Sequence, residues 1–587
     1  MFDTAYWVKG NHTFKFGVDM LHNWDLINNT YESNGDYSYS YIGNYFADVY
    51  AEANSLANAG CASGAPQVAT YNTTGSSAGT VSSAVGSLPC YTTYYQGYGN
   101  PLFSITTMDY GFFAQDNWKL SPRLTVELGL RYDYESLPQP SSTLTQASGS
   151  YTPFPGVANR PSDKNNMGPR IGFAYDVFGD GKTVLRGGYG MYYGRILNGT
   201  IENIYLNTGS PLGQYTTTYH TTTAGAPTFP DLSASGGSAP SAPSVYYFDK
   251  HMQNPLVHEF DLIVQQDLGK TAVLNVSYLG SLGRELPNFI DLNLNPATSL
   301  ATINFTGGGP IPDGTTVQIP TYTGYGNTAL FGSLASKFQA ITEAVSNVNS
   351  SYNALVGEIK TRDFHGLEMD ANYTWSHALD YSQNALTQGS GNDVYDPYGP
   401  MRPNYGNSNY NVPNRFVAYA LYHIPGVHRG DWVKYAANDW TFSDDFQMQN
   451  GLPYSASLSG YNSKNAVLTG LNGAGGQTYI PQGVIPGFGL GRNTFSVRRA
   501  IVDDLRLVKG IPFTERYVLE LRGDLFNVAN HPNVGGIGST AYIFNDTGAL
   551  ASTAAYQPTT FGVPTSINSS GFSFTPREIQ ISARLSF

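Results

Sequence analysis

Few side chains of this sequence stand at a spacing that supports catalysis. The run at 179–183 resembles the end of a phosphate-binding loop, but Asp176 stands five residues before Gly181, where such a loop needs a glycine. The adjacent carboxylates at 444–445 and at 503–504 fall in predicted strands, where neighbouring side chains point to opposite faces and cannot share a proton directly. We therefore expect no catalytic residue and no enzyme activity.

Residues that could bind a metal or form a disulfide are also sparse. His423 and His428 flank a predicted turn, and no carboxylate or cysteine stands at a ligand spacing beside them, so we expect no metal site and no cofactor. Cys61 and Cys90 are the only two cysteines and fall in one long loop. This arrangement permits a single disulfide in an oxidising compartment, and two unpaired thiols are the alternative.

Tyrosine is abundant, with 44 residues in 587, and it clusters in the same loop. A tyrosine ring offers a flat apolar face and a polar tip, so these side chains could stack on a sugar or peptide ligand. The alternative, which we favour, is that they extend strands and pack on one another. The candidates for ligand binding are Tyr37, Tyr39, Tyr41, Tyr94, Tyr95 and Tyr98.

The elements that would position such residues are strands with a strict alternation of apolar and polar side chains. At 124–134 every second residue is apolar, and the residues between them are polar, charged or glycine. A strand of this length, tilted by about 45°, covers about 25 Å, which is the height of the apolar band on an outer-membrane barrel. A Ser-Pro-Arg turn joins it to a similar strand at 110–119. This hairpin alone fits a soluble β-sandwich equally well.

The same unit recurs along the whole chain. We predict about fifteen strands, in which short turns alternate with loops of roughly 30 to 80 residues, as in outer-membrane barrels with periplasmic turns and extracellular loops. The fold class predicted is therefore an all-β, transmembrane, antiparallel β-barrel. The strands are predicted at 4–9, 13–20, 110–119, 124–134, 170–177, 183–193, 259–268, 272–279, 354–361, 367–375, 416–423, 440–448, 502–508, 517–525 and 579–587.

Composition agrees with this prediction and excludes other classes. Charged residues make up 13% of the chain, and its net charge is −12, which does not fit a nucleic-acid partner. No run of 18 apolar residues is present, so a membrane-spanning helix is not expected. The last predicted strand alternates up to Phe587, which the count of turns places at the periplasmic end. We expect Phe587 to be an assembly signal for the barrel assembly machinery.

Eight short phrases of the sequence resemble the Oar-like TonB-dependent outer-membrane transporters. In order they are FAQDNW at 113–118, LGLRYD at 128–133, PRIGFAY at 169–175, TVLRGGYG at 183–190, VSYLGS at 276–281, SYNAL at 351–355, YTWSHAL at 373–379 and FNVANHP at 526–532. Each phrase is weak alone, but their order along the chain is fairly specific. The resemblance extends over most of the chain, from about residue 7 to residue 587.

The resemblance implies energised uptake of a large solute through a plugged barrel in the cell outer membrane, driven by the TonB complex. Such transporters carry an export signal, a carboxypeptidase-regulatory-like domain, a plug and a TonB-contacting box, none of which is recognisable here. We therefore expect residues 1–587 to be a single, N-terminally truncated barrel domain with about fifteen of about 22 strands. The alternative is a structural or adhesive surface barrel that does not transport.

Polar side chains of the predicted strands would face the lumen, where they would line the solute path or hold a plug, while the apolar side chains would contact outer-membrane lipid. The extracellular ligand is not specified by these residues. The predicted lumen-facing residues are Glu127, Arg131, Arg186, Glu368, Asp370, Glu520, Arg522 and Arg584.

Overall fold

The computed structural model describes most of the 587 residues. The description leaves out residues 40–41, 56–60, 62–70, 73–79, 82–87, 150, 222–224, 234–241, 270, 296–298, 322–324, 382–397, 428–431, 460–490, 515, 546–550 and 569–574.

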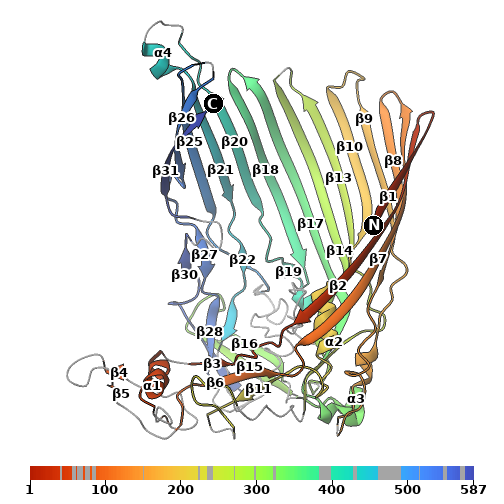
Figure 1. Cartoon of the computed structure of the whole chain (residues 1–587), viewed down its shortest axis with the longest axis vertical. Coiled ribbons are helices and arrows are strands. Elements are labelled where there is room, and N and C mark those ends of the chain that lie inside the picture. The colour runs from red at the N-terminus through yellow and green to blue at the C-terminus, as the bar shows by residue number, and fades with distance from the viewer. Residues whose placement is uncertain are drawn as a thin grey trace.

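One sheet of 17 strands forms the body of the molecule, and Figure 1 shows it curving from β1 round to β31. Fifteen of these strands pair in chain order, each antiparallel to the next. Each overlaps one strand predicted from the alternation, so the predicted fold class is confirmed. In the described part of the chain, β1 and β31 pair with one neighbour each and form the two edges of the sheet.

The fifteen strands are β1 (Phe2–Lys9), β2 (His12–Asn28), β7 (Leu102–Ser121), β8 (Leu124–Ser136), β9 (Met167–Asp176), β10 (Thr183–Tyr193), β13 (Leu256–Asp267), β14 (Ala272–Asp291), β17 (Ile341–Phe364), β18 (Leu367–Asp380), β20 (Asn414–His423), β21 (Trp440–Gln449), β25 (Ala500–Pro512), β26 (Val518–Phe526) and β31 (Glu578–Ser586). The other two strands of the sheet are β12 (Val245–Phe248), which is parallel to β17, and β19 (Gly406–Asn407), which pairs with β18.

The strands agree with the sequence prediction at their short turns and extend further at the opposite ends. Strands β14 and β17 have 20 and 24 residues, and both extend well past the segments predicted at 272–279 and 354–361. The backbone ladder continues there, but outside lipid an outward side chain no longer has to be apolar. The alternation that identifies a strand therefore stops before the strand itself does.

The two faces of the sheet differ in polarity, and the register keeps them separate from strand to strand. One, here called the apolar face, exposes large hydrophobic side chains such as Leu128 at 43%, Leu262 at 47% and Leu355 at 45%. The other, here called the polar face, carries most of the charged side chains of these strands, whereas Asp116, Asp444 and Asp503 lie on the apolar face by register. A soluble sandwich would bury its apolar face against a second sheet, whereas this face is open and suits contact with lipid.

The long connections, expected as loops, fold into small sheets and helices at one end of the large sheet (Figure 1). Their strands are β3 (Asp36–Ser38), β4 (Tyr71–Asn72), β5 (Thr80–Val81), β6 (Thr93–Tyr98), β11 (Tyr215–Tyr219), β15 (Ser299–Thr306), β16 (Thr316–Thr321), β22 (Pro453–Tyr454), β23 (Ser457–Ser459), β24 (Phe495–Ser496), β27 (Val534–Ile537), β28 (Thr540–Asn545), β29 (Ala551–Tyr556) and β30 (Pro564–Ile567).

The helices are α1 (Ile42–Ala53), α2 (Asn198–Leu206), α3 (Thr328–Phe331) and α4 (Trp432–Ala437), with 3-10 turns at Pro155–Ala158, Gly332–Lys337 and Arg402–Asn404. Only α4 lies at the end with the short turns (Figure 1). Across the described ranges, every helix is too short or too polar to cross a bilayer.

The main hydrophobic core lies under these connections, away from the middle of the sheet. Helix α2 contributes Ile201 and Ile204, which are almost fully buried together with Phe248 of β12 and Phe289 of β14. Segments outside lipid meet water and must bury apolar side chains against each other, as in a soluble protein. The prediction that these connections are loops is therefore wrong for a physical reason: they form small sheets and helices because they need hydrophobic cores of their own.

The two faces can be tested with neighbouring residues of β8. Leu128→Arg places a charge on the apolar face and is expected to lower the free energy of unfolding by about 2 to 4 kcal/mol if the site is near the bilayer midplane. Glu127→Gln on the polar face should change it little. Urea unfolding in lipid vesicles, followed by tryptophan fluorescence, measures both, and equal effects would contradict the assigned faces.

Candidate functional site

The register places all eight predicted lumen-facing residues on the polar face. Arg131 is opposite Gly168, Glu127 is opposite Asn117 and Gly172, and Asp370 is opposite Lys360. At the other side of the sheet Glu520 is opposite Arg584. Because side chains alternate with a period of two, an unbroken register carries the same face across all strands between these pairs. The sheet thus gathers distant parts of the sequence on one polar surface.

Arg131 lies at the centre of an ion-pair network near the loop end of the polar face. Its Nε donates a hydrogen bond to Asp133 Oδ1 at 2.8 Å, and its Nη2 lies 3.5 Å from Asp19 Oδ2. Gly111 lies opposite Asp133 on the neighbouring strand, and a Cβ there would approach Arg131 Nη2 to 2.3 Å. The glycine therefore provides the space that the guanidinium occupies.

Other predicted residues are also paired on this face. Lys360 Nζ lies 2.9 Å from Glu358 Oε1 and 3.2 Å from Asp370 Oδ2. Arg522 pairs with Glu520 two residues before it. Asn117 Nδ2 donates a hydrogen bond to Glu127 Oε1 at 3.1 Å.

Three predicted residues differ from these. Among the side chains that the structure describes, Arg186, Glu368 and Arg584 have neither a hydrogen-bond nor an ion-pair partner. Because Arg186 and Arg584 are also exposed, their charges are available to a solute or to another segment that contacts this face.

A recess of about 540 Å³ lies on this face across β7 to β10 and β13. Gly129, Gly172 and Gly188 line it, and their missing side chains help to leave the volume open. Arg186, Glu259 and Asp261 provide charges of both signs, while the guanidinium of Arg170 stacks 4.3 Å from the ring centre of Tyr192. Such a surface suits a polar solute with both donors and acceptors.

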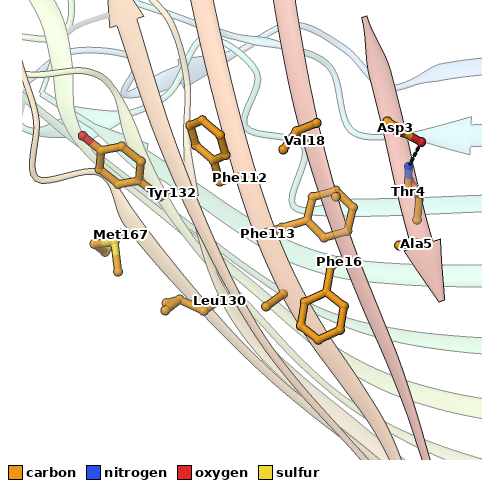
Figure 2. Close-up of a pocket in the computed structure, with 12 residues that line it drawn as sticks. Asp3, Thr4, Ala5, Phe16, Val18, Phe112, Phe113, Leu130, Tyr132 and Met167 are labelled. Atoms are coloured by element: carbon orange, nitrogen blue, oxygen red, sulfur yellow. Dashed lines mark hydrogen bonds between the residues drawn. The ribbon is translucent and has the colours of Figure 1, made fainter. Parts of the chain in front are cut away.

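An apolar groove of about 560 Å³ lies between strands β1, β2, β7 and β8. Figure 2 shows Phe16, Val18, Phe112 and Leu130 along it. These residues belong to the apolar face by register, so the groove is part of the surface that contacts lipid.

Two of the aromatic loop candidates, Tyr37 and Tyr94, pack against each other. Tyr94 is fully buried beside Tyr37, Tyr91 and Tyr219, and its hydroxyl bonds Gln96 Oε1 at 2.8 Å. Its ring therefore serves the core of the small sheet β3-β6-β11 and presents no face to a ligand.

The other loop tyrosines have a range of environments. The hydroxyl of Tyr37 donates to Thr228 O at 2.9 Å, and that of Tyr98 donates to Gln96 Oε1 at 3.0 Å. Tyr39 binds a carboxylate on α1, and Tyr95 is only partly buried. Tyr41 lies outside the described residues. Mutual packing, the interpretation favoured from sequence, accounts for Tyr37 and Tyr94.

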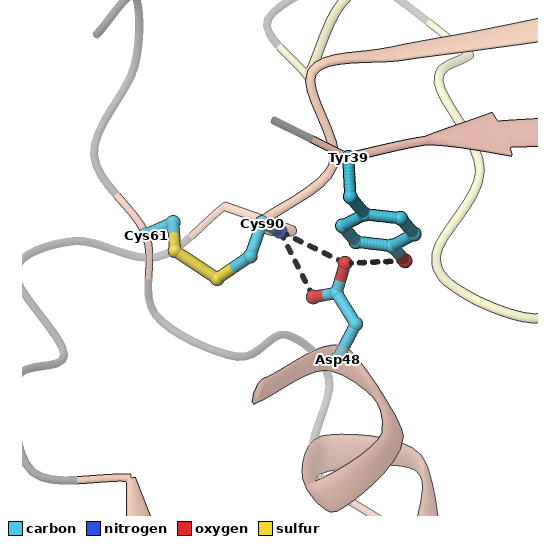
Figure 3. Close-up of a disulfide and its surroundings, with 4 residues drawn as sticks. All are labelled: Tyr39, Asp48, Cys61 and Cys90. Carbon is cyan, nitrogen blue, oxygen red and sulfur yellow. Dashed lines mark hydrogen bonds between the residues drawn. A yellow bond between two sulfur atoms is a disulfide. The ribbon is translucent and has the colours of Figure 1, made fainter. Parts of the chain in front are cut away.

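A disulfide and a buried carboxylate connect this small sheet to α1 (Figure 3). Cys61 and Cys90 are bonded, and Cys90 N donates to both carboxylate oxygens of Asp48 at 2.9 and 3.0 Å. The hydroxyl of Tyr39 donates to the same carboxylate at 2.9 Å. Burial raises the pKa of Asp48 to about 6, although these hydrogen bonds act in the opposite direction. Sequence reasoning did not identify Asp48, because nothing in its sequence neighbourhood marks it as buried.

The chain belongs to the outer membrane beta barrel domain family, whose model matches residues 1–580. Its location is the outer membrane, and the apolar face is the surface that contacts lipid. No curated protein sequence matches the chain.

Several solved structures are similar to it. The outer membrane transporter YddB from Escherichia coli is 12% identical with a TM-score of 0.46, over 99% of this chain and 53% of that one. The ferripyoverdine receptor of Pseudomonas aeruginosa is 11% identical with a TM-score of 0.44, over 100% and 47%. The FrpB iron transporter from Neisseria meningitidis is 10% identical with a TM-score of 0.42, over 99% and 54%. This chain thus spans about half the length of each.

Because Arg131 has ion-pair partners and Arg186 has none in the described part of the chain, substitution of the two arginines should lower the free energy of unfolding by different amounts. Arg131→Met leaves Asp133 and Asp19 without their partner and is expected to lower the free energy of unfolding by about 1 kcal/mol. Arg186→Met, at an exposed and unpaired arginine, should change it by less than about half of that. Urea unfolding in lipid vesicles compares the two, and a larger loss for Arg186→Met would refute the pairing scheme.

Asp48 predicts a pH dependence for the α1 region. An acid with a raised pKa in the folded state contributes stability that is present below its unfolded pKa of about 3.9 and is lost as pH rises through about 6. Amide exchange of α1, corrected for its intrinsic rate, should therefore become less protected between pH 4 and pH 7. Asp48→Asn should flatten this profile. Amides of β17 provide the internal control, and identical α1 profiles for both proteins would count against the assignment.

Proposed function

We propose that this barrel domain is the wall of a TonB-dependent transporter of the Oar-like type, which takes up a large solute such as an oligosaccharide, a peptide or a metal chelate. The observation that supports it is the single polar face, which is continuous over fifteen strands of an outer-membrane barrel domain and carries unpaired charges. A solute in water needs such a surface to cross the apolar layer.

In this proposal the polar face lines the solute path or holds a plug. Arg186, Glu368 and Arg584 are the charges available for that contact, while Arg131, Asp370, Glu520, Arg522 and Glu127 are held by neighbours. The partners would be the TonB complex, outer-membrane lipid and the barrel assembly machinery. Residues 1–587 would act as one barrel domain.

The rival function is a structural or adhesive surface barrel. The observation that favours it is the aromatic sheet β3-β6-β11, together with the disulfide between Cys61 and Cys90 in the same long connection. The two functions differ in whether a solute crosses the membrane. Growth on panels of oligosaccharides, peptides and ferric chelates as sole nutrient source, with and without a functional TonB complex, separates them. Growth that requires both this protein and TonB supports transport. Its absence on every panel, with surface attachment retained, supports the rival.

The recess on the polar face gives a steric test of transport. A Cβ at Gly172 would meet its nearest neighbour only at 3.7 Å, so Gly172→Leu should fold normally and fill part of the recess. We expect it to reduce TonB-dependent growth several-fold. The matched control is Gly357→Leu, because Gly357 lies on the apolar face and a Cβ there meets nothing within 4 Å. Equal growth of the two variants would indicate that solute does not pass this recess.

We also propose that Phe587 contributes to assembly. It follows β31, whose Ile581 and Leu585 are exposed on the apolar face at 85% and 53%, and is itself 82% exposed. Phe587→Ser should reduce the amount of heat-modifiable barrel in the outer membrane, while Phe513→Ser, at another exposed phenylalanine, should not. Normal insertion of Phe587→Ser would refute this role.

A further inference from the structure

A second recess on the polar face, of about 350 Å³, lies where β2, β7 and β8 reach the loop end of the sheet. Its charged lining consists of the carboxylates of Asp19, Asp109, Asp133 and Glu135 with the guanidinium groups of Arg131 and Arg195. Negative groups therefore outnumber positive ones. An excess of acid alone does not make a binding site, because carboxylate oxygens that already accept hydrogen bonds are not available to a ligand.

Most hydrogen-bond acceptors here are occupied. Arg131 forms ion pairs with Asp133 and Asp19. Arg195 Nη1 lies 3.2 Å from Asp109 Oδ2. Glu135 Oε2 accepts from Ile196 N at 2.9 Å and from Asn254 Nδ2 at 2.7 Å.

Three buried acceptors are left over. Among the described residues, Asp109 Oδ1, Glu135 Oε1 and Asn166 Oδ1 have no hydrogen-bond donor. Glu135 is only 7% exposed and Asn166 only 1%, and both line the recess. A buried acceptor without a donor destabilises the folded protein, and more so where it carries charge.

Two of these residues are also neighbours across the sheet. Asp109 and Glu135 are direct cross-strand partners on β7 and β8. Two carboxylates opposite each other repel, and only Arg195 forms an ion pair with this couple in the described part of the chain. The position is therefore short of both positive charge and hydrogen-bond donors.

We propose that this recess binds a primary ammonium group of the solute. An ammonium carries N–H donors and one positive charge, and both are lacking around Asp109 and Glu135. The volume suits one such group with its alkyl chain. A metal ion fits less well, because no three His, Cys, Asp or Glu side chains of the described residues come together to hold one. This inference rests on the proposed transport function and names its substrate class as amine-bearing.

The test uses the purified full chain in detergent and isothermal titration with Nα-acetyl-lysine methylamide as the probe. The matched uncharged probe carries an acetyl group on Nε and has the same backbone. We expect at least tenfold weaker binding of the acetylated probe, which corresponds to about 1.4 kcal/mol. Equal affinity for the two probes would overturn the proposal.

Variants locate the binding. Glu135→Gln and Asp109→Asn should each weaken binding of the charged probe at least tenfold, whereas Asp180→Asn, in a remote short turn, should not. Glu135→Gln combined with Asn166→Asp restores one carboxylate and should recover part of the affinity. If Glu135→Gln does not fold, as judged by heat-modifiable migration, Asp109→Asn carries the test. Unchanged affinity in Asp109→Asn refutes the site.

The two proposals fail in different ways. If the charged and the acetylated probe bind with equal affinity while TonB-dependent growth is intact, only the ammonium site is overturned. Specific probe binding without TonB-dependent growth on any panel overturns the transport function and leaves a surface protein that binds amines.

Discussion

Backbone hydrogen bonding in lipid is the constraint on which the rest of this structure depends. Hydrocarbon offers no partner to a peptide N–H or C=O, so strands in the bilayer must pair with one another. The antiparallel ladders satisfy this requirement on both sides of each long strand between β1 and β31. Once the strands are paired, the pleat fixes which side chains face lipid and which face away, so Leu128 and Glu127 take opposite faces although they are neighbours.

The polar face follows from the same pleat, and its details follow from glycine and charge. Gly111 leaves the space in which Arg131 reaches Asp133, and Gly172 leaves part of a recess open. Paired charges such as Lys360 and Asp370 are held within the wall, whereas unpaired ones such as Arg186 are available for contact. Some polar residues therefore stabilise the sheet through ion pairs, and others present exposed charges on the polar face.

Where the strands leave the lipid, the chain meets water and different interactions stabilise it. In water the connections bury their own cores, as the packing of Ile201 and Phe289 shows, and polar groups become buried with them. Asp48 is bound by Tyr39 and by the backbone of a disulfide-bonded cysteine, and its pKa rises because water is excluded. This buried carboxylate therefore belongs to the part of the molecule where the connections exclude water.

The sequence by itself determined the fifteen strands and their two faces, because apolar and polar side chains alternate along the strands that contact lipid. For the same reason it predicted that Arg131 and Glu520 share one face, and the register places both on the polar face. It could not show strand lengths beyond the apolar band, where the alternation has no physical cause, nor the sheets and helices within the connections. Only the tertiary structure decided that Tyr94 is buried and that Asp109 meets Glu135, since both facts depend on residues brought together from different strands and connections.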